Sequence, residues 1–204
     1  MSTVHYNWKR FWCPRNGFFK LSDNGFLYDP ESEFSKYYNS DVFSFENISL
    51  KPCLVLLGEP GIGKSTTLEQ EFHALNVRQK CFYKNLGEYG DESRLINEVF
   101  KSTEIEEWLN SDYVLNLFLD SLDECKIKVE QVGLIFKNQF EKIKSKLNRL
   151  HLRIACRTAD FPSILDNCLP NLWGKDNFGV YEMVPLRRKD VEHAAGVNSI
   201  ESKH

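Results

Sequence analysis

The stretch from Gly58 to Ser65 constrains this chain more than any other, because it matches the pattern G-x-x-x-x-G-K-[ST] at every fixed position. Glycines let a backbone wrap closely around a polyphosphate, and the free N–H groups at a helix start then point at the anion. An apolar run, Leu54–Leu57, enters the loop, and a helical pattern leaves it. The sequence therefore predicts a phosphate-binding loop between a strand and a helix, rather than a glycine-rich turn with a stray lysine.

Each residue type in this loop has its own expected task. Lys64 is expected to reach the β- and γ-phosphates of a nucleotide, and the Ser65 hydroxyl is expected to be a ligand of Mg²⁺. The predicted nucleotide-binding residues are Gly58, Glu59, Pro60, Gly61, Ile62, Gly63, Lys64, Ser65 and Thr66.

The composition is that of an ordinary globular protein with enough apolar residues for a core. The 204 residues carry a net charge of −3, and 42% of them are hydrophobic. This balance gives no reason to expect nucleic acid or a membrane as an obligatory partner. No apolar run approaches the length of a membrane span, Met1–Arg10 lacks the apolar core of a signal peptide, and the six cysteines form no C-x-x-C pair. We therefore expect a cytoplasmic protein without a zinc site or a disulfide framework.

Residues 1–50 differ from the rest because they hold about half of the aromatic residues. The segment 18–28 is expected to form a hairpin that turns at Asn24-Gly25. So much aromatic surface must be buried, either by packing this extension on the rest of the chain or by a partner, since exposed aromatic patches mark interfaces. Both alternatives are open at the level of sequence.

A second motif follows an apolar run that starts at Tyr113 and ends in Asp120. A buried parallel strand with an active carboxylate at its C-terminal end has this form. In P-loop enzymes this acid holds Mg²⁺ directly or through water, so Asp120 joins Ser65 as a predicted metal ligand. Asp123 and Glu124 follow, and at least one of them is predicted to polarise the attacking water. Capping of the next helix is the alternative role.

Strand-like runs alternate with helical patterns from residue 53 to residue 195. The clearest helix is predicted over 129–150, where apolar residues recur every three or four positions. The strand after it leads to Arg157, which a parallel sheet would place near a γ-phosphate; a surface salt bridge is the alternative. A last helix is predicted over 187–195. The predicted fold is α/β: a P-loop NTPase three-layer sandwich with a mainly parallel central sheet.

Three ordered motifs, GEPGIGKST, LFLDSLDE and RIACRTADFP, resemble those of the signal-transduction ATPases with numerous domains (STAND). The resemblance is to the NACHT branch and its bacterial antiviral relatives. In that family a small residue follows the metal-binding aspartate and a pair of acids stands two positions later, as Ser121, Asp123 and Glu124 stand here. The sensor arginine of the family matches Arg157, and Pro185-Leu186 resembles the junction with a helical neighbour.

The resemblance implies an ATP- or ADP-binding, Mg²⁺-dependent and slowly hydrolysing domain of a defence switch, with Asp123, Glu124 and Arg157 in catalysis. It implies a nucleotide domain over 51–196, an extension over 1–50 and a tail over 197–204. In the family, ADP holds a closed state and ATP exchange allows assembly into an oligomer. Family members continue into further domains that this sequence does not contain. A truncated form is therefore expected, which associates with itself or with a full-length relative.

Three other functions make different demands on the sequence. A non-catalytic module would use its aromatic N-terminal segment for assembly. A small-molecule kinase would need an arginine-bearing lid, and the sequence holds no such insertion. A GTPase would need a glycine where Asp123 stands and an Asn-Lys-x-Asp motif, and neither is present.

Overall fold

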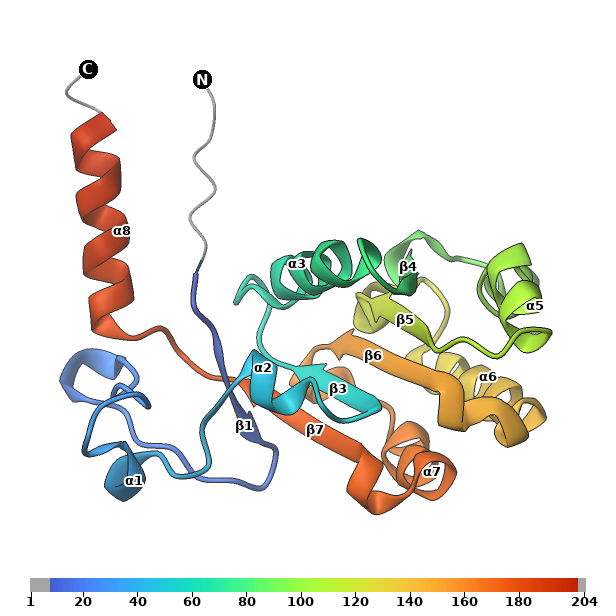
Figure 1. Ribbon diagram of the computed structural model, residues 1–204, viewed down its shortest axis with the longest axis horizontal. Coiled ribbons are helices and arrows are strands. Elements are labelled where there is room, and N and C mark those ends of the chain that lie inside the picture. Colours follow the sequence, from blue (N-terminus) through green and yellow to red (C-terminus); the bar gives the residue numbers. More distant parts are fainter. Residues whose placement is uncertain (1–7, 202–204) are drawn as a thin grey trace.

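The computed structural model describes residues 8–201 and shows a seven-stranded mixed sheet with helices on both faces (Figure 1). Strands β3 to β7 are parallel to one another, and β1 pairs antiparallel with both β7 and β2. The order across the sheet is β2-β1-β7-β3-β6-β5-β4. This arrangement confirms the predicted α/β class with a mainly parallel sheet. The strands are β1 (Phe11–Pro14), β2 (Phe43–Ser44), β3 (Cys53–Leu57), β4 (Lys80–Asn85), β5 (Leu115–Asp120), β6 (Leu150–Cys156) and β7 (Phe178–Met183).

The helices connect the strands and cover the sheet. One of them differs from its predicted length: the helix expected over 129–150 ends at Lys142, because Ile143 leaves helical backbone angles and a 3₁₀ turn follows. The α-helices are α1 (Ser35–Tyr38), α2 (Phe45–Ile48), α3 (Lys64–Asn76), α4 (Glu92–Leu95), α5 (Thr103–Leu109), α6 (Val129–Lys142), α7 (Ser163–Trp173) and α8 (Arg188–Glu201). A π-helical turn covers Ile96–Phe100, and 3₁₀ turns cover Asp23–Gly25, Leu86–Glu88, Leu122–Glu124, Lys144–Arg149, Thr158–Asp160 and Lys175–Asn177.

Strand β3 shows why the molecule has three layers. Its residues are buried on both faces of the sheet, as a run without polar alternation requires. Leu54 and Leu56 pack in one hydrophobic cluster with residues of α2 and α3. Val55 and Leu57 pack in another cluster with residues of α5, α6 and α7. Helices therefore cover both sides of the strand that carries the predicted loop.

The strand order determines which side chains can meet. Strand β6 lies between β3, which leads into the loop, and β5, which ends at Asp120. Because these strands are parallel, their carboxyl ends lie at the same edge of the sheet. The loop after β3, Asp120 and the residue after β6, Arg157, are thus brought side by side.

The N-terminal segment contributes two strands to the same sheet. Trp12 of β1 lies opposite Met183 of β7 and is fully buried. The predicted hairpin is reduced to a single antiparallel bridge between Leu21 and Leu27, around the left-handed residue Asn24. Some aromatic side chains of this segment are therefore buried, while those of Phe18, Phe34 and Tyr37 are exposed.

The last helix, α8, follows β7 and rises away from the sheet (Figure 1). It is longer than the predicted helix over 187–195 and includes residues 197–201, because no proline interrupts it. Within residues 8–201, no helix combines the length and the apolar character that crossing a membrane requires.

Candidate nucleotide-binding site

The loop between β3 and α3 has the backbone that its glycines permit. Gly58, Gly61 and Gly63 all have positive φ angles, which side chains other than glycine rarely adopt. A Cβ at Gly58 would also lie 3.1 Å from the side chain of Ile62. Gly63 is the residue directly before α3, so the free N–H groups of the first turn of this helix follow the loop at once. This geometry is suited to an anion.

Lys64, the first residue of α3, folds back over the loop. Its Nζ donates hydrogen bonds to the carbonyl oxygens of Gly58 (2.6 Å) and Glu59 (3.0 Å). Burial lowers the pKa of this ammonium from its ordinary value, and the carboxylates of Asp123 and Asp120 act against that shift. In the described part of the chain, no carboxylate lies within ion-pair distance of Lys64. The cation is therefore held by neutral partners that an anion can replace.

Ser65 and Asp120 are in contact, as the sequence predicts for two ligands of one metal ion. The Ser65 hydroxyl donates to Asp120 Oδ1 at 3.1 Å. Asp120, at the end of β5, is only 3% exposed. Its second oxygen, Oδ2, accepts a hydrogen bond of 2.9 Å from the hydroxyl of Tyr83 on β4. Burial and the neighbouring carboxylate raise the pKa of Tyr83, so this hydroxyl keeps its proton.

Asp123 and Arg157 form a second pair in the site. Asp123 Oδ2 lies 2.7 Å from Arg157 Nε, and Asp123 Oδ1 accepts a hydrogen bond of 2.9 Å from the Arg157 backbone N–H. The Asp123 side chain is 5% exposed, and that of Arg157 is 43% exposed. The chain can place Asp123 here because Ser121 adopts a left-handed conformation after β5. Both oxygens of Asp123 are therefore engaged, whereas the Glu124 side chain is exposed.

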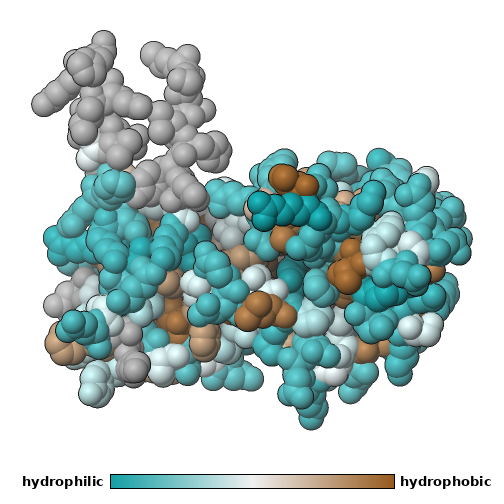
Figure 2. All heavy atoms as spheres, viewed as in Figure 1, coloured by the Kyte–Doolittle hydropathy of each residue, from teal (hydrophilic) through white to brown (hydrophobic). Residues whose placement is uncertain are grey.

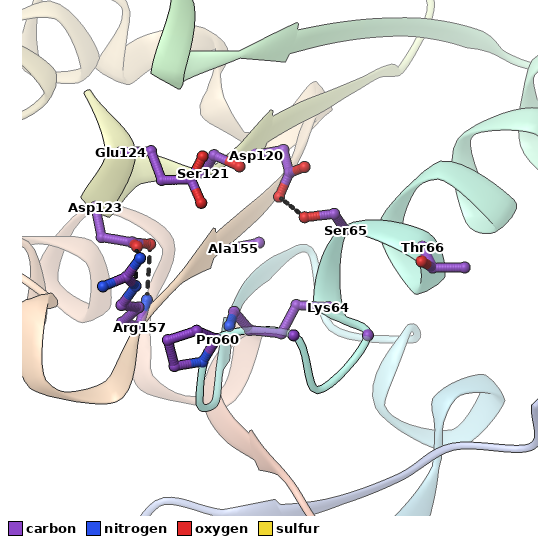
Figure 3. Close-up of a pocket in the computed structure, with 12 residues that line it drawn as sticks. Pro60, Lys64, Ser65, Thr66, Asp120, Ser121, Asp123, Glu124, Ala155 and Arg157 are labelled. Atoms are coloured by element: carbon purple, nitrogen blue, oxygen red, sulfur yellow. Dashed lines mark hydrogen bonds and ion pairs between the residues drawn. The ribbon is translucent and has the colours of Figure 1, made fainter. Parts of the chain in front are cut away.

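These side chains surround one cavity of about 210 Å³ (Figure 3). In the close-up, Lys64 and Pro60 lie on one side of the hollow and Asp123, Glu124 and Asp120 on the other. Ser121 and Ala155 also line it, although sequence reasoning did not select them. Three predicted residues, Gly58, Glu59 and Ile62, support the loop without lining the cavity. The lining residues are Pro60, Gly61, Gly63, Lys64, Ser65, Thr66, Asp120, Ser121, Asp123, Glu124, Ala155 and Arg157.

The donor set of the cavity fits a phosphate group with Mg²⁺. Backbone N–H groups and an ammonium suit phosphate oxygens, and hydroxyl and carboxylate oxygens suit a hard divalent cation. Within residues 8–201 there is no cluster of three or more His, Cys, Asp or Glu side chains that would hold a metal by protein ligands alone. Mg²⁺ usually keeps several waters and binds through one or two protein oxygens together with phosphates, and Ser65 and Asp120 match that use.

A larger groove of about 590 Å³ lies beside α3. It shares a helix turn with the cavity, because the Thr67 hydroxyl, at the groove, donates to the carbonyl oxygen of Gly63. Its walls combine aromatic, acidic and basic side chains from the N-terminal segment and α3. The lining residues are Trp8, Lys9, Arg10, Phe45, Glu46, Thr67, Gln70, Glu71 and Ala74.

Sequence reasoning missed two features of this region. Tyr83 stands in a strand without any motif, and only the pairing of β4 with β5 brings it to Asp120. The groove is formed by segments far apart in the sequence, so no local pattern marks it.

The strand order, the loop between β3 and α3 and the acid at the end of β5 together define a P-loop NTPase fold.

No protein-family model matches this sequence, and no curated protein matches it either. Three of the solved structures that this chain matches are the following. A DNA replication initiation factor shares 19% identity over 76% of this chain and 47% of its own, with a TM-score of 0.48. AMPPCP-bound DnaA from Aquifex aeolicus shares 20% identity over 71% and 44%, with a TM-score of 0.44. A Drosophila ORC structure, bound to AT-rich DNA and Cdc6, shares 13% over 68% and 51%, with a TM-score of 0.45. This chain spans about half the length of these structures, and likeness at this level assigns no function.

Proposed function

We propose that this chain binds ATP with Mg²⁺ and hydrolyses it slowly, as the nucleotide domain of a STAND-type signalling switch. The observation that carries the proposal is the contact of Ser65 with Asp120, directly beside the Lys64 ammonium on its loop carbonyls. A glycine-rich turn without a ligand would have no need of a buried carboxylate against the first turn of α3. The order of the three motifs supports the STAND assignment.

The groups of the protein have separate roles in binding phosphate, holding Mg²⁺ and activating water. The N–H groups of the loop and the first turn of α3, with Lys64, bind the phosphate oxygens. Ser65 and Asp120 hold Mg²⁺, which, when bound, neutralises charge on the phosphates. Glu124, exposed on the rim of the cavity, orients the attacking water and accepts its proton. These roles need no cofactor besides the nucleotide and its cation.

Asp123 has a different role from Glu124 in this proposal. Both of its oxygens are bonded to Arg157, so it positions that arginine rather than the water. The guanidinium of Arg157 is partly exposed and lines the cavity, where it can rotate toward a γ-phosphate. The backbone bond from Arg157 to Asp123 does not depend on that rotation. Arg157 can thus report whether a third phosphate is present, as a switch requires.

We assign the nucleoside to the groove beside α3. The groove opens at the same helix turn as the phosphate cavity, and the residues that line it include an aromatic ring, Phe45, and a carboxylate, Glu46, which could accept a hydrogen bond from an amino group. Replacing Phe45 by alanine is expected to weaken ATP binding and to leave the binding of inorganic tripolyphosphate unchanged. Equal weakening of both ligands would place the nucleoside elsewhere.

The test of the proposed activity is multiple-turnover release of phosphate from ATP. Wild-type protein should release phosphate slowly, and Asp120→Asn and Glu124→Gln should each abolish the release. Glu124→Gln should still bind ATP, because it removes a general base and no phosphate contact. Phosphate release that is the same in both variants as in the wild type would contradict the proposal.

A non-catalytic interaction module is a second candidate, and the exposed aromatic residues favour it. Phe18, Phe34 and Tyr37 of the N-terminal segment are all more than half exposed. On the face shown in Figure 2, however, apolar residues lie in separate small groups among hydrophilic ones. Assembly that depends on Phe34 and Tyr37, in a protein that releases no phosphate, would favour the module over the ATPase.

A further inference from the structure

We propose that Tyr83 is a positioning residue that orients the Asp120 carboxylate for Mg²⁺, an inference that rests on the proposed ATP site. The contact that motivates it is the hydrogen bond of 2.9 Å from the Tyr83 hydroxyl to Asp120 Oδ2. Asp120 is almost fully buried, so the partners of its two oxygens decide how the carboxylate is turned.

The position of Tyr83 follows from the register of two parallel strands. Tyr83 on β4 lies opposite Phe118 on β5, and Asp120 stands two residues further along β5. Residues two apart on a strand share a face, so Phe118 and Asp120 face the same layer, that of α3. The phenol of Tyr83 is long enough to reach from beside Phe118 to the carboxylate at the strand end.

The Tyr83 ring is held by the helix that also carries the metal-binding serine. Its centroid lies 5.4 Å from that of Phe72 on α3, and Phe72 packs edge-on against Phe118 at 5.8 Å. Aromatic pairs at these distances have preferred mutual orientations. The hydroxyl of Tyr83 is thereby fixed relative to Ser65, at the start of the same helix.

The two hydrogen bonds to Asp120 have different consequences. An ionised carboxylate only accepts hydrogen bonds, so Tyr83 and Ser65 are the donors. Tyr83 takes Oδ2, and this leaves Oδ1 directed at the Ser65 hydroxyl. Without Tyr83, Oδ2 loses its donor and the carboxylate is free to turn. Groups that orient a metal ligand in this way typically contribute 10–100-fold in metal affinity when removed.

The test compares Tyr83→Phe with Tyr181→Phe. Tyr181 lies in the same hydrophobic cluster but on β7, which is separated from β4 by the three strands β3, β6 and β5. Each variant loses one hydroxyl and keeps its ring, so packing is matched. A fluorescent ATP analogue is titrated into each protein in EDTA, and Mg²⁺ is then titrated at a fixed analogue concentration.

We expect Tyr83→Phe to need about 10–100-fold more Mg²⁺ than the wild type for half of the Mg²⁺-dependent effect. Its affinity for the analogue in EDTA should equal that of the wild type, which a general loss of structure would not allow. Tyr181→Phe should match the wild type in both titrations.

An unchanged Mg²⁺ requirement in Tyr83→Phe, while Asp120→Asn raises it, would overturn the role of Tyr83 and leave the ATP site intact. A wild-type protein that binds no analogue under either condition would overturn the proposed function, and this inference with it. The two failures are therefore distinguishable.

Discussion

Two cations, Lys64 and Arg187, stand near the same edge of the sheet in opposite surroundings. Arg187, just before α8, is 4% exposed and is enclosed by carboxylates. Its Nε and Nη2 donate to both oxygens of Asp190, at 2.7 and 2.8 Å, and its Nη1 contacts Asp29 and Glu31. The guanidinium also lies over the Phe11 ring at 4.8 Å. Lys64, by contrast, bonds within the described residues to carbonyl oxygens of its own loop.

The difference separates a structural cluster from the proposed ligand site. Around Arg187 the protein supplies every opposite charge itself, and Lys9 and Lys189 further pair with Glu31 and Asp29. This cluster joins the N-terminal segment to the start of α8. Among residues 8–201, the Lys64 ammonium has no carboxylate within ion-pair distance and bonds to the carbonyl oxygens of Gly58 and Glu59, as a cation that awaits an anion should. Mutations around Arg187 should therefore lower the free energy of unfolding, whereas mutations at Lys64 should weaken ligand binding.

The largest effect on stability is expected for Arg187→Ala. Removing a buried cation leaves Asp190 and its neighbours without their partner, and breaking a buried ion pair typically costs about 3–5 kcal/mol. We expect the lower end, about 3 kcal/mol in the free energy of unfolding, because Asp29 and Glu31 are partly exposed. Urea denaturation measures it. Arg188→Ala is the matched control: its pair with Glu192 is exposed, and its loss should cost less than about 1 kcal/mol.

A smaller effect is expected for Asp123→Asn. The substitution weakens a bond to Arg157 in which one partner is buried and the other is half-exposed, so we expect a loss of about 1 kcal/mol. If Asp123 positions Arg157, the variant should also lose its preference for ATP over ADP in a binding titration. A variant of unchanged stability that binds both nucleotides normally and releases no phosphate would instead assign Asp123 to the attacking water.

The smallest effect is expected from mild acid. Asp29 has a lowered pKa: burial raises it, but hydrogen bonds from Lys189 and Arg187 outweigh burial. Hydrogen bonds from Lys9 and Arg187 lower the pKa of Glu31. A carboxyl group whose pKa is lower in the folded protein than in the unfolded chain stabilises the folded protein above about pH 4. This stabilisation is lost as the pH falls through the pKa of the folded state.

We expect each of these carboxylates to contribute less than about 1 kcal/mol, because both are partly exposed. Urea denaturation at several pH values between roughly pH 6 and pH 3 measures the loss of folding free energy. Asp29→Asn should flatten the dependence. A loss of equal size in Asp29→Asn and the wild type would show that other acids are responsible.

Sequence reasoning found the parts of the site that local patterns encode. The phosphate loop is continuous in the sequence, and Asp120 and Arg157 each end an apolar run, so their places at one sheet edge follow from the parallel fold. Pairings across the sheet could not be read in this way. The bond of Tyr83 to Asp120 depends on the register of β4 against β5, and the place of β1 beside β7 depends on contacts between distant segments. The cluster of Arg187 with Asp29 and Glu31 likewise joins residues about 160 positions apart, which no motif predicts.

The most direct test of the proposed ATP site is the free energy of unfolding in urea, with and without Mg²⁺ and ATP, for the wild type and Lys64→Ala. A ligand that binds only the folded state at about 100 times its dissociation constant stabilises a protein by about 2.7 kcal/mol. We predict a gain of that size for the wild type and none for Lys64→Ala, whose stability without ligand should differ by less than about 1 kcal/mol because its bonds are to neutral carbonyls. No gain in the wild type, or an equal gain in both proteins, would contradict the account.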